Sequence, residues 1–167
     1  MTIGEDSDSD LTRLAARAGL RLAAAHTILT TAESCTGGWI SKVITDISGS
    51  SQWFHEGFVT YSNDSKHERL GVPMSVLQKH GAVSEATARA MAAGALRRAR
   101  ADVAVAVTGI AGPGGGVPGK PVGTVWLAWA RRSERRVSVE PQLRHFRGNR
   151  DAVRRKTVRA ALLGLLR

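Results

Sequence analysis

Cysteine, proline and aromatic residues are scarce in this sequence of 167 residues, which has one cysteine, Cys35, and five prolines. A single cysteine cannot form an intrachain disulfide, and there is no cysteine pair of the kind that structural zinc sites use. The histidines at 26, 55, 67, 80 and 145 include no pair four residues apart, so the H-E-x-x-H zinc motif is missing. We therefore expect neither a metal site nor a cofactor.

Long hydrophobic runs are missing as well. No apolar run approaches the roughly 18 to 20 residues that cross a bilayer. The first ten residues, MTIGEDSDSD, have neither the basic nor the apolar region of a signal peptide. We expect a cytoplasmic protein without membrane contact. Residues 1–10 carry four acids and no base, which favours a disordered leader before one domain over residues 11–167.

Acidic residues are rare near the C-terminus, and this is the source of the net charge of +10. Residues 1–130 contain 12 lysines and arginines against 11 acids, whereas residues 131–167 contain 12 against 3. A basic segment of this kind can meet a polyanion, a single phosphate group or only water. The composition therefore leaves a nucleic-acid-binding protein and a phosphate-binding enzyme both open.

Hydrophobic periodicity predicts alternating helices and strands. Helices are expected over residues 11–25, 39–47, 62–70, 84–101 and 150–166, with Asp10, Ser62, Ser84 and Asn149 as N-caps and a short further helix opened by Pro73. Strands are expected over 27–32, 54–61, 103–107, 122–130 and 135–146. Strands separated by helices favour parallel pairing. The predicted fold is a three-layer α/β/α domain with a mixed sheet, in which the first three strands are parallel and an antiparallel hairpin follows a glycine-rich loop.

Ligands of open α/β sheets bind at the carboxyl ends of the parallel strands, and the first such end is residues 33–38, E-S-C-T-G-G. Ser34 and Cys35 are both possible nucleophiles. Gly37 and Gly38 allow backbone amides to approach a ligand, and the N-terminus of the next helix favours a developing oxyanion. An ordinary capping turn, in which Ser34 or Thr36 satisfies helix amides, explains the same residue types.

The second strand end is residues 61–66, Y-S-N-D-S-K. Lys66 can act as a base toward a serine only if burial or a nearby cation lowers its pKa from about 10.4 towards roughly 7 to 8. Alternatively, Lys66 with its neighbours His67, Glu68 and Arg69 is the solvated face of a surface helix.

The third strand end is residues 108–112, where a glycine-rich loop over residues 109–121 begins. Residues 114–120 match the G-x-x-x-x-G-K part of a phosphate-binding P-loop. However, Pro121 replaces the magnesium-binding hydroxyl, Pro118 removes an amide, and a strand follows where a helix is required. We therefore expect no ATP or GTP site, and prefer an active-site loop near Gly109 and Gly112 to a plain surface loop.

The basic C-terminal segment offers two arginines, Arg147 and Arg150, at a predicted junction between a strand and a helix. Arginine forks suit phosphate, and a helix N-terminus there would add to an anion site. The arginines and lysine of the following helix are expected on its solvated outer face, and they are Arg154, Arg155, Lys156 and Arg159.

Seven short blocks, in this order, resemble one family. They are T-A-E-S-C-T-G-G at 31–38, G-S-S at 49–51, G-F-V-T-Y-S-N-D-S-K at 57–66, H-G-A-V-S-E at 80–85, T-G-I-A-G-P at 108–113, K-P-V-G-T-V at 120–125 and G-N-R at 148–150. The family is the C-terminal domain of the competence/damage-inducible protein CinA, and the resemblance runs from about residue 10 to the end.

The resemblance implies a homodimeric amidohydrolase that converts nicotinamide mononucleotide and water to nicotinic acid mononucleotide and ammonia. It implies a nucleophile at Ser34 and a base at Lys66, with Tyr61 and Thr108 as further catalytic positions. Together with the strand-end reasoning above, it predicts substrate binding by Glu33, Thr36, Gly37, Gly38, Gly109 and Gly112, with Arg147 or Arg150 at the phosphate. Backbone amides near residues 36–38 or at Gly109 would hold the oxyanion. Glu33 would orient either Lys66 or a ribose hydroxyl.

Besides a catalytically silent relative that acts as an oligomeric scaffold, which the intact motifs disfavour, two rival interpretations remain open at this stage. In one, the enzyme is retained but Cys35 is the nucleophile. In the other, the protein is a non-enzymatic competence or DNA-damage accessory factor that binds nucleic acid through its basic segment. The shortage of aromatic residues there, where Phe146 stands alone, disfavours nucleic acid as a partner.

Overall fold

The structure is a computed structural model that describes residues 7–134 and 136–167. Its centre is a five-stranded sheet in the order β2-β1-β3-β4-β5. The strands are β1 Leu29–Glu33, β2 Phe54–Val59, β3 Val103–Gly109, β4 Thr124–Ser133 and β5 Arg136–His145. Strand β1 pairs in parallel with β2 and β3, whereas β4 pairs antiparallel with β3 and with β5. The predicted mixed sheet, with three parallel strands and a hairpin after the glycine-rich loop, is confirmed.

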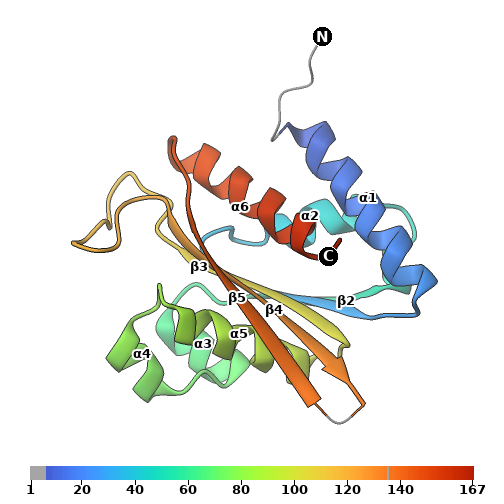
Figure 1. Cartoon of the computed structure of the whole chain (residues 1–167), viewed down its shortest axis with the longest axis horizontal. Coiled ribbons are helices and arrows are strands. Elements are labelled where there is room, and N and C mark those ends of the chain that lie inside the picture. The colour runs from blue at the N-terminus through green and yellow to red at the C-terminus, as the bar shows by residue number, and fades with distance from the viewer. Residues whose placement is uncertain (1–6, 135) are drawn as a thin grey trace.

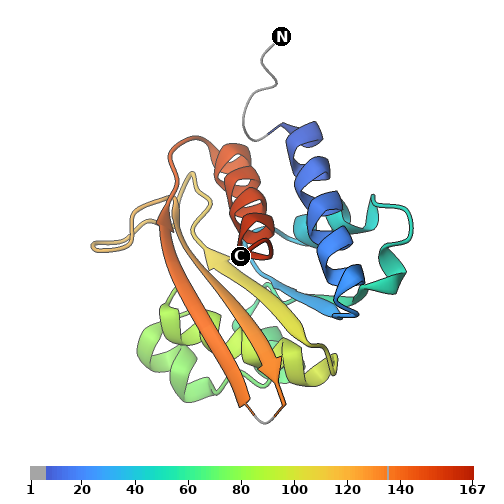
Figure 2. The same cartoon turned by 45° about the vertical axis from the view of Figure 1, so that its right-hand side comes forward.

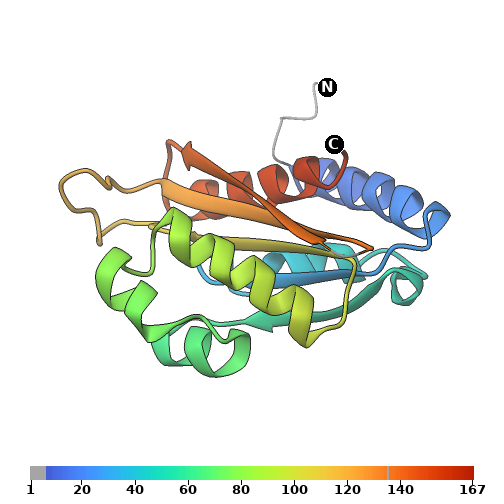
Figure 3. The ribbon, with the colours of Figure 1, turned by 60° about the horizontal axis from the view of Figure 1, so that its bottom comes forward.

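Helices cover both faces of the sheet. The longer ones are α1 Asp8–Ala24, α5 Glu85–Arg98 and α6 Arg150–Gly164, and the shorter ones are α2 Trp39–Thr45, α3 Asn63–Leu70 and α4 Met74–His80. A single 3-10 turn, η1 Ser50–Gln52, precedes β2. Helices α1, α2 and α6 lie on one face and α3, α4 and α5 on the other (Figures 1 and 3). Helices α1 and α6 lie side by side (Figure 2). The predicted three-layer α/β/α architecture is thus confirmed.

The two faces of the sheet differ because large and small residues alternate along the central strands. In β3, Val103, Val105 and Val107 pack against α1, α2 and α6, whereas Ala104 and Ala106 face the alanine-rich helix α5. Every one of these side chains is at least 96% buried. Small residues on both sides allow α5 to lie close to the sheet.

The N-terminal boundary differs from the prediction. Helix α1 begins at Asp8 rather than Leu11, and Ser7 is its N-cap, because the Ser7 side chain accepts a hydrogen bond from the Asp10 amide. Asp10 is not a cap; its side chain is buried and forms ion pairs with Arg13 and Arg159. The predicted leader therefore does not extend over residues 8–10, and residues 1–6 of that prediction lie outside the described part of the chain.

Other element ends shift by a few residues, and Pro73 is the N-cap of α4 rather than its first helical residue. Ser62, Ser84 and Asn149 cap α3, α5 and α6 as predicted, each through a side-chain oxygen that accepts a backbone amide. Among the residues that the structure describes, no helix is long and apolar enough to cross a membrane. No group of three histidine, cysteine or acidic side chains in that part of the chain could hold a metal ion.

Candidate active site

Ser34 directly follows the first parallel strand, β1. Its amide donates to the Val107 carbonyl oxygen at 3.1 Å, which continues the pairing of β1 with β3 by one residue. The chain then turns sharply through residues 35–38 into α2, with Gly37 at φ 63° and Gly38 at φ 96°, a region that favours glycine. The Ser34 side chain, 8% exposed, lies on the α3 to α5 face of the sheet, where it contacts Lys66. The sequence therefore places a serine hydroxyl at the carboxyl edge of the sheet.

Lys66 is one of the most deeply buried polar residues of the described chain, with 1% of its surface exposed. It lies on α3 four residues before the buried Leu70, so that both side chains share the helix face that packs on the sheet. Its Nζ lies 3.0 Å from Ser34 Oγ, 2.9 Å from the Thr60 carbonyl oxygen and 3.0 Å from that of Tyr61. The alternative of a solvated lysine is wrong.

Burial lowers the pKa of Lys66 from 10.5 to about 8, because the ammonium loses its hydration in the interior. About a tenth of the molecules therefore carry a neutral amine at pH 7. A neutral amine in hydrogen-bond contact with a serine hydroxyl meets the geometric requirement for a general base.

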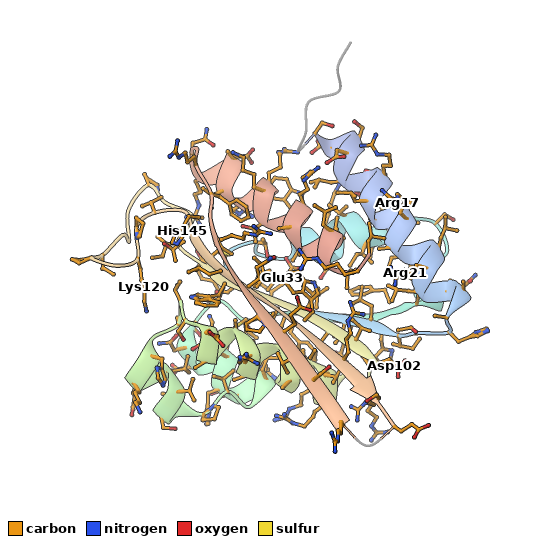
Figure 4. The ribbon with its side chains drawn as sticks, in the orientation of Figure 1. Arg17, Arg21, Glu33, Asp102, Lys120 and His145 are labelled. Atoms are coloured by element: carbon orange, nitrogen blue, oxygen red, sulfur yellow. The ribbon has the colours of Figure 1, made fainter. Side chains whose placement is uncertain are left out.

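Glu33 lies at the centre of the molecule, between the sheet and α2 (Figure 4), and is fully buried. Its Oε2 accepts hydrogen bonds from Thr36 Oγ1 and from the amides of Gly38 and Ile40, at 2.6, 3.1 and 3.0 Å. Its Oε1 accepts two more from the amide and hydroxyl of Ser41, both at 2.8 Å. Glu33 therefore caps the N-terminus of α2 from within. These hydrogen bonds involve the start of α2 and the turn before it, and not Lys66, which was one of the two predicted partners of Glu33.

This arrangement changes which amides are open to an oxyanion. The Gly38 amide donates to Glu33, and the Gly37 amide donates to the Ser34 carbonyl oxygen at 3.1 Å. Of the amides at residues 36–38 that the sequence predicted as donors, those of Gly37 and Gly38 are therefore occupied. Among the described residues, no other residue accepts a hydrogen bond from the amide of Cys35 or Thr36. These two amides, directly after the serine, are the available donors at the turn.

Cys35 points away from the serine into the hydrophobic core beneath α1, α2 and α6 and is 5% exposed. Burial raises the pKa of its thiol from 9.0 to about 12. A thiol that stays protonated at neutral pH is a poor nucleophile. The structure thus disfavours Cys35 as the reactive group.

Tyr61, Arg150 and Gly112 form a connected group beside this pair. The Arg150 guanidinium donates to Tyr61 Oη at 3.2 Å and to the Gly112 carbonyl oxygen at 2.8 Å. Tyr61 also reaches the lysine through its own carbonyl oxygen. Hydrogen bonds therefore connect Ser34, the second strand end, the glycine-rich loop and the start of α6, which are far apart in sequence. Tyr61 is 63% exposed, so this group forms the outer part of the site.

The remaining predicted residues lie at the same edge in different roles. Thr108 is buried, and its hydroxyl donates to the Ala82 carbonyl oxygen at 2.8 Å, which ties β3 to the loop before α5. Gly109 is required by close packing, because a Cβ there would lie 2.9 Å from the Thr124 carbonyl oxygen. Arg147 is exposed, and its carbonyl oxygen accepts a hydrogen bond from Lys156 at 2.8 Å. The glycine-rich loop, which carries Lys120, projects from this end near His145 (Figure 4).

Arg154 was not predicted from the sequence as a residue of the site. Expected on the solvated face of α6, it donates instead to the carbonyl oxygens of Cys35 and Thr36, at 3.1 and 2.8 Å. Its guanidinium also lies 5.3 Å from the ring centroid of Trp39. The spacing contained a usable signal, because Arg154 follows Arg150 by four residues and so shares its helix face.

Much of the basic charge of residues 131–167 has partners within the chain. Backbone carbonyl oxygens or acids of other elements bind Arg131, Arg132, Arg154, Arg155, Arg159 and Arg167. Arg131 and Arg167 bind residues within the segment, whereas the other four bind residues of the rest of the fold. The basic segment therefore has a structural use that does not need a polyanion.

The fold and site together define a three-layer α/β/α protein with a buried serine and lysine pair at the carboxyl edge of its parallel strands. The chain belongs to the CinA C-terminal domain family, whose model matches residues 11–167.

Similar proteins cover nearly the whole chain. It is 53% identical over 156 residues to "Nicotinamide-nucleotide amidohydrolase PncC" of Escherichia coli strain K12, with 93% of each chain aligned. The protein of that name from Pseudomonas putida is also 53% identical, covering 93% of this chain and 95% of its own. A solved competence/damage-inducible protein from Agrobacterium tumefaciens matches with a TM-score of 0.88 and 46% identity, over 99% of this chain and 98% of its own.

Proposed function

We propose that this protein hydrolyses the carboxamide of nicotinamide mononucleotide, giving nicotinic acid mononucleotide and ammonia. The observation that carries the proposal is the 3.0 Å contact between Ser34 Oγ and a buried Lys66 of lowered pKa. Relatives that bear the name of this activity at 53% identity, over almost the full length of both chains, support the choice of substrate.

In the proposed mechanism, two carbonyl oxygens orient the base. A neutral amine has two N–H groups, and the carbonyl oxygens of Thr60 and Tyr61 are positioned to accept both. The nitrogen lone pair then faces Ser34 Oγ, from which it takes a proton as Oγ attacks the carboxamide carbon. The resulting ammonium donates to the same two oxygens, so the proton transfer needs no rearrangement of the base.

The tetrahedral intermediate carries a negative charge on the former amide oxygen. We propose the amides of Cys35 and Thr36 as its donors, at a typical value of about 3 kcal/mol per donor. The Lys66 ammonium then gives its proton to the leaving nitrogen, which departs as ammonia and leaves an ester on Ser34. Water loses a proton to Lys66 and attacks this ester, releasing the carboxylate product and restoring the serine hydroxyl.

Arg150 and Arg147 are the proposed contacts for the substrate phosphate. Both are exposed at this edge, and an arginine fork can bind phosphate through two hydrogen bonds. Tyr61, hydrogen-bonded to Arg150, would line the path between the phosphate and the reacting carbon. Thr108, Gly109 and Gly112 would shape the opposite wall through the backbone contacts described above. From the family resemblance we also propose a homodimer in the cytoplasm, which sedimentation and cell fractionation test.

The decisive experiment follows ammonia release from nicotinamide mononucleotide without added metal. Wild-type protein should release one ammonia per nicotinic acid mononucleotide formed. Ser34→Ala should lose at least about 10³-fold in kcat, whereas Cys35→Ala should retain most of it. A folded wild-type protein that releases no ammonia would refute the activity, and full activity in Ser34→Ala would refute the nucleophile.

A further inference from the structure

One arginine, Arg154, binds the turn that follows Ser34 from the side opposite Lys66. Arg154 reaches it from α6, which lies on the opposite face of the sheet from Lys66 and α3 (Figure 3). Its Nε donates to the Cys35 carbonyl oxygen at 3.1 Å, and one terminal nitrogen donates to that of Thr36 at 2.8 Å. One planar guanidinium thus binds two successive peptide groups of the turn.

Because Arg154 binds the Cys35 carbonyl oxygen, it also determines the direction of the Thr36 N–H in the same peptide group. In a trans peptide the C=O and N–H bonds point in opposite directions. The Cys35 carbonyl and the Thr36 N–H belong to one peptide group, so a carbonyl directed at Arg154 on the α6 side directs the N–H toward the other face. Ser34 Oγ and Lys66 lie on that other face. The Thr36 amide is also one of the two that no other described residue uses.

Among the described residues, Arg154 alone binds the Cys35 carbonyl oxygen, whereas the Thr36 carbonyl oxygen also accepts a hydrogen bond from the Trp39 amide at 3.3 Å. The Ser34 carbonyl oxygen is fixed by the Gly37 amide at 3.1 Å, and the Thr36 side chain is fixed by Glu33. The Cys35 carbonyl oxygen, between them, is bound by Arg154. A cation on this oxygen also polarises the peptide group and strengthens its N–H as a donor.

We propose that Arg154 is a positioning residue that aims and polarises the Thr36 amide as an oxyanion donor. The inference rests on the proposed function for its substrate, but it concerns a different step, the stabilisation of the tetrahedral intermediate. Arg154 itself contacts neither Ser34 Oγ nor Lys66 Nζ among the hydrogen bonds of the described residues.

The chain provides a matched control in the next residue. Arg155 also lies over the Trp39 ring, at 4.8 Å from its centroid, but its ion pairs are with Asp8 on α1 and Asp151 on α6. Arg154→Ala and Arg155→Ala each remove one guanidinium from the same aromatic ring. A loss that follows only from disturbing this stack should appear in both.

The test compares kcat, KM and the pH profile of these two variants with those of the wild type, using nicotinamide mononucleotide. Arg154→Ala should lower kcat about 10- to 100-fold with KM changed less than about threefold, because the interaction is made in the transition state. The rising acid limb of its pH profile should stay in place, since Lys66 keeps its surroundings. Equal kcat values for the two variants, or a loss confined to KM, would overturn the proposal.

Two further measurements keep the test decisive. If Arg154→Ala does not fold, Arg154→Lys replaces it in the test. This variant retains a cation but cannot donate to both carbonyl oxygens in a planar fork, so its kcat should be at least about fivefold lower than that of the wild type. A kcat equal to that of the wild type in this variant would refute the inference. Labelling of Ser34 by a fluorophosphonate tests the role of Arg154 independently of the proposed substrate. Labelling should slow in Arg154→Ala even if nicotinamide mononucleotide is not the substrate, and an unchanged rate would count against Arg154.

Discussion

Replacement of Lys66 by methionine should change how the free energy of unfolding depends on pH. Lys66 is 1% exposed in the folded protein, where burial lowers its pKa from 10.5 to about 8. Between these two values the unfolded chain holds a proton that the folded protein has released. Stability therefore rises with pH through this window, and below pH 8 the fold carries the full cost of the buried ammonium.

The size of the effect follows from the two pKa values. A difference between 10.5 and about 8 corresponds to about 3 kcal/mol at 1.36 kcal/mol per pH unit. Near pH 9 the Lys66 contribution should change by about 1 kcal/mol per pH unit. The methionine side chain in Lys66→Met does not titrate. Between pH 7 and pH 9.5, the free energy of unfolding of the wild type should therefore rise by about 2 kcal/mol relative to that of this variant.

Urea unfolding at pH 7, 8, 9 and 9.5 measures this difference, because all other titrating groups are present in both proteins. Lys79→Met is the control, since Lys79 is exposed on α4 and should give a curve parallel to that of the wild type. A constant difference between wild type and Lys66→Met across this range would refute the assignment of a buried, destabilising charge at Lys66.

Three further results are expected. The kcat/KM for the amide should rise about tenfold per pH unit below pH 8 and level off above it, because neutral Lys66 is the base; a flat profile from pH 6 to 9 would contradict this. Glu33→Gln should lower the free energy of unfolding by about 2 to 4 kcal/mol in urea titrations, since the new NH₂ group meets donors around a buried site; an unchanged midpoint would contradict it. Gly164→Ala should lower the free energy of unfolding by about 1 to 3 kcal/mol, measured by thermal unfolding, because its Cβ would overlap the Trp129 ring; an unchanged melting temperature would contradict it.

The fold was predictable to a large extent from local patterns. The β-branched runs predicted strands, and side-chain caps at Ser62, Ser84 and Asn149 marked the starts of three helices. The predicted start of the first helix was wrong because Asp10, judged only by its neighbours in sequence, resembles an N-cap. Its burial against Arg159, 149 residues later, is a tertiary contact that no local rule contains.

For the candidate site, the sequence predicted which segments lie together but not which hydrogen bonds they form. The rule that ligands bind at the carboxyl ends of parallel strands selected residues 33–38, 61–66 and 108–112, and these segments do meet at one edge. The roles within that edge depended on distances. Glu33 contacts the start of α2, and the amides of Gly37 and Gly38 are occupied, because a buried carboxylate must be satisfied by the donors nearest to it.

The sequence by itself determined the order of strands and helices, the serine at the end of the first strand and the lysine on the helix after the second. Periodicity and caps express interactions within a few residues of the chain, so one sequence contains them. Only the tertiary structure decided that Lys66 loses its water, that Cys35 faces the core and that Arg154 grips the serine turn from the far side of the sheet. These properties depend on which surfaces are brought together across the sheet, since hydration, pKa and hydrogen-bond partners are set by neighbours in space.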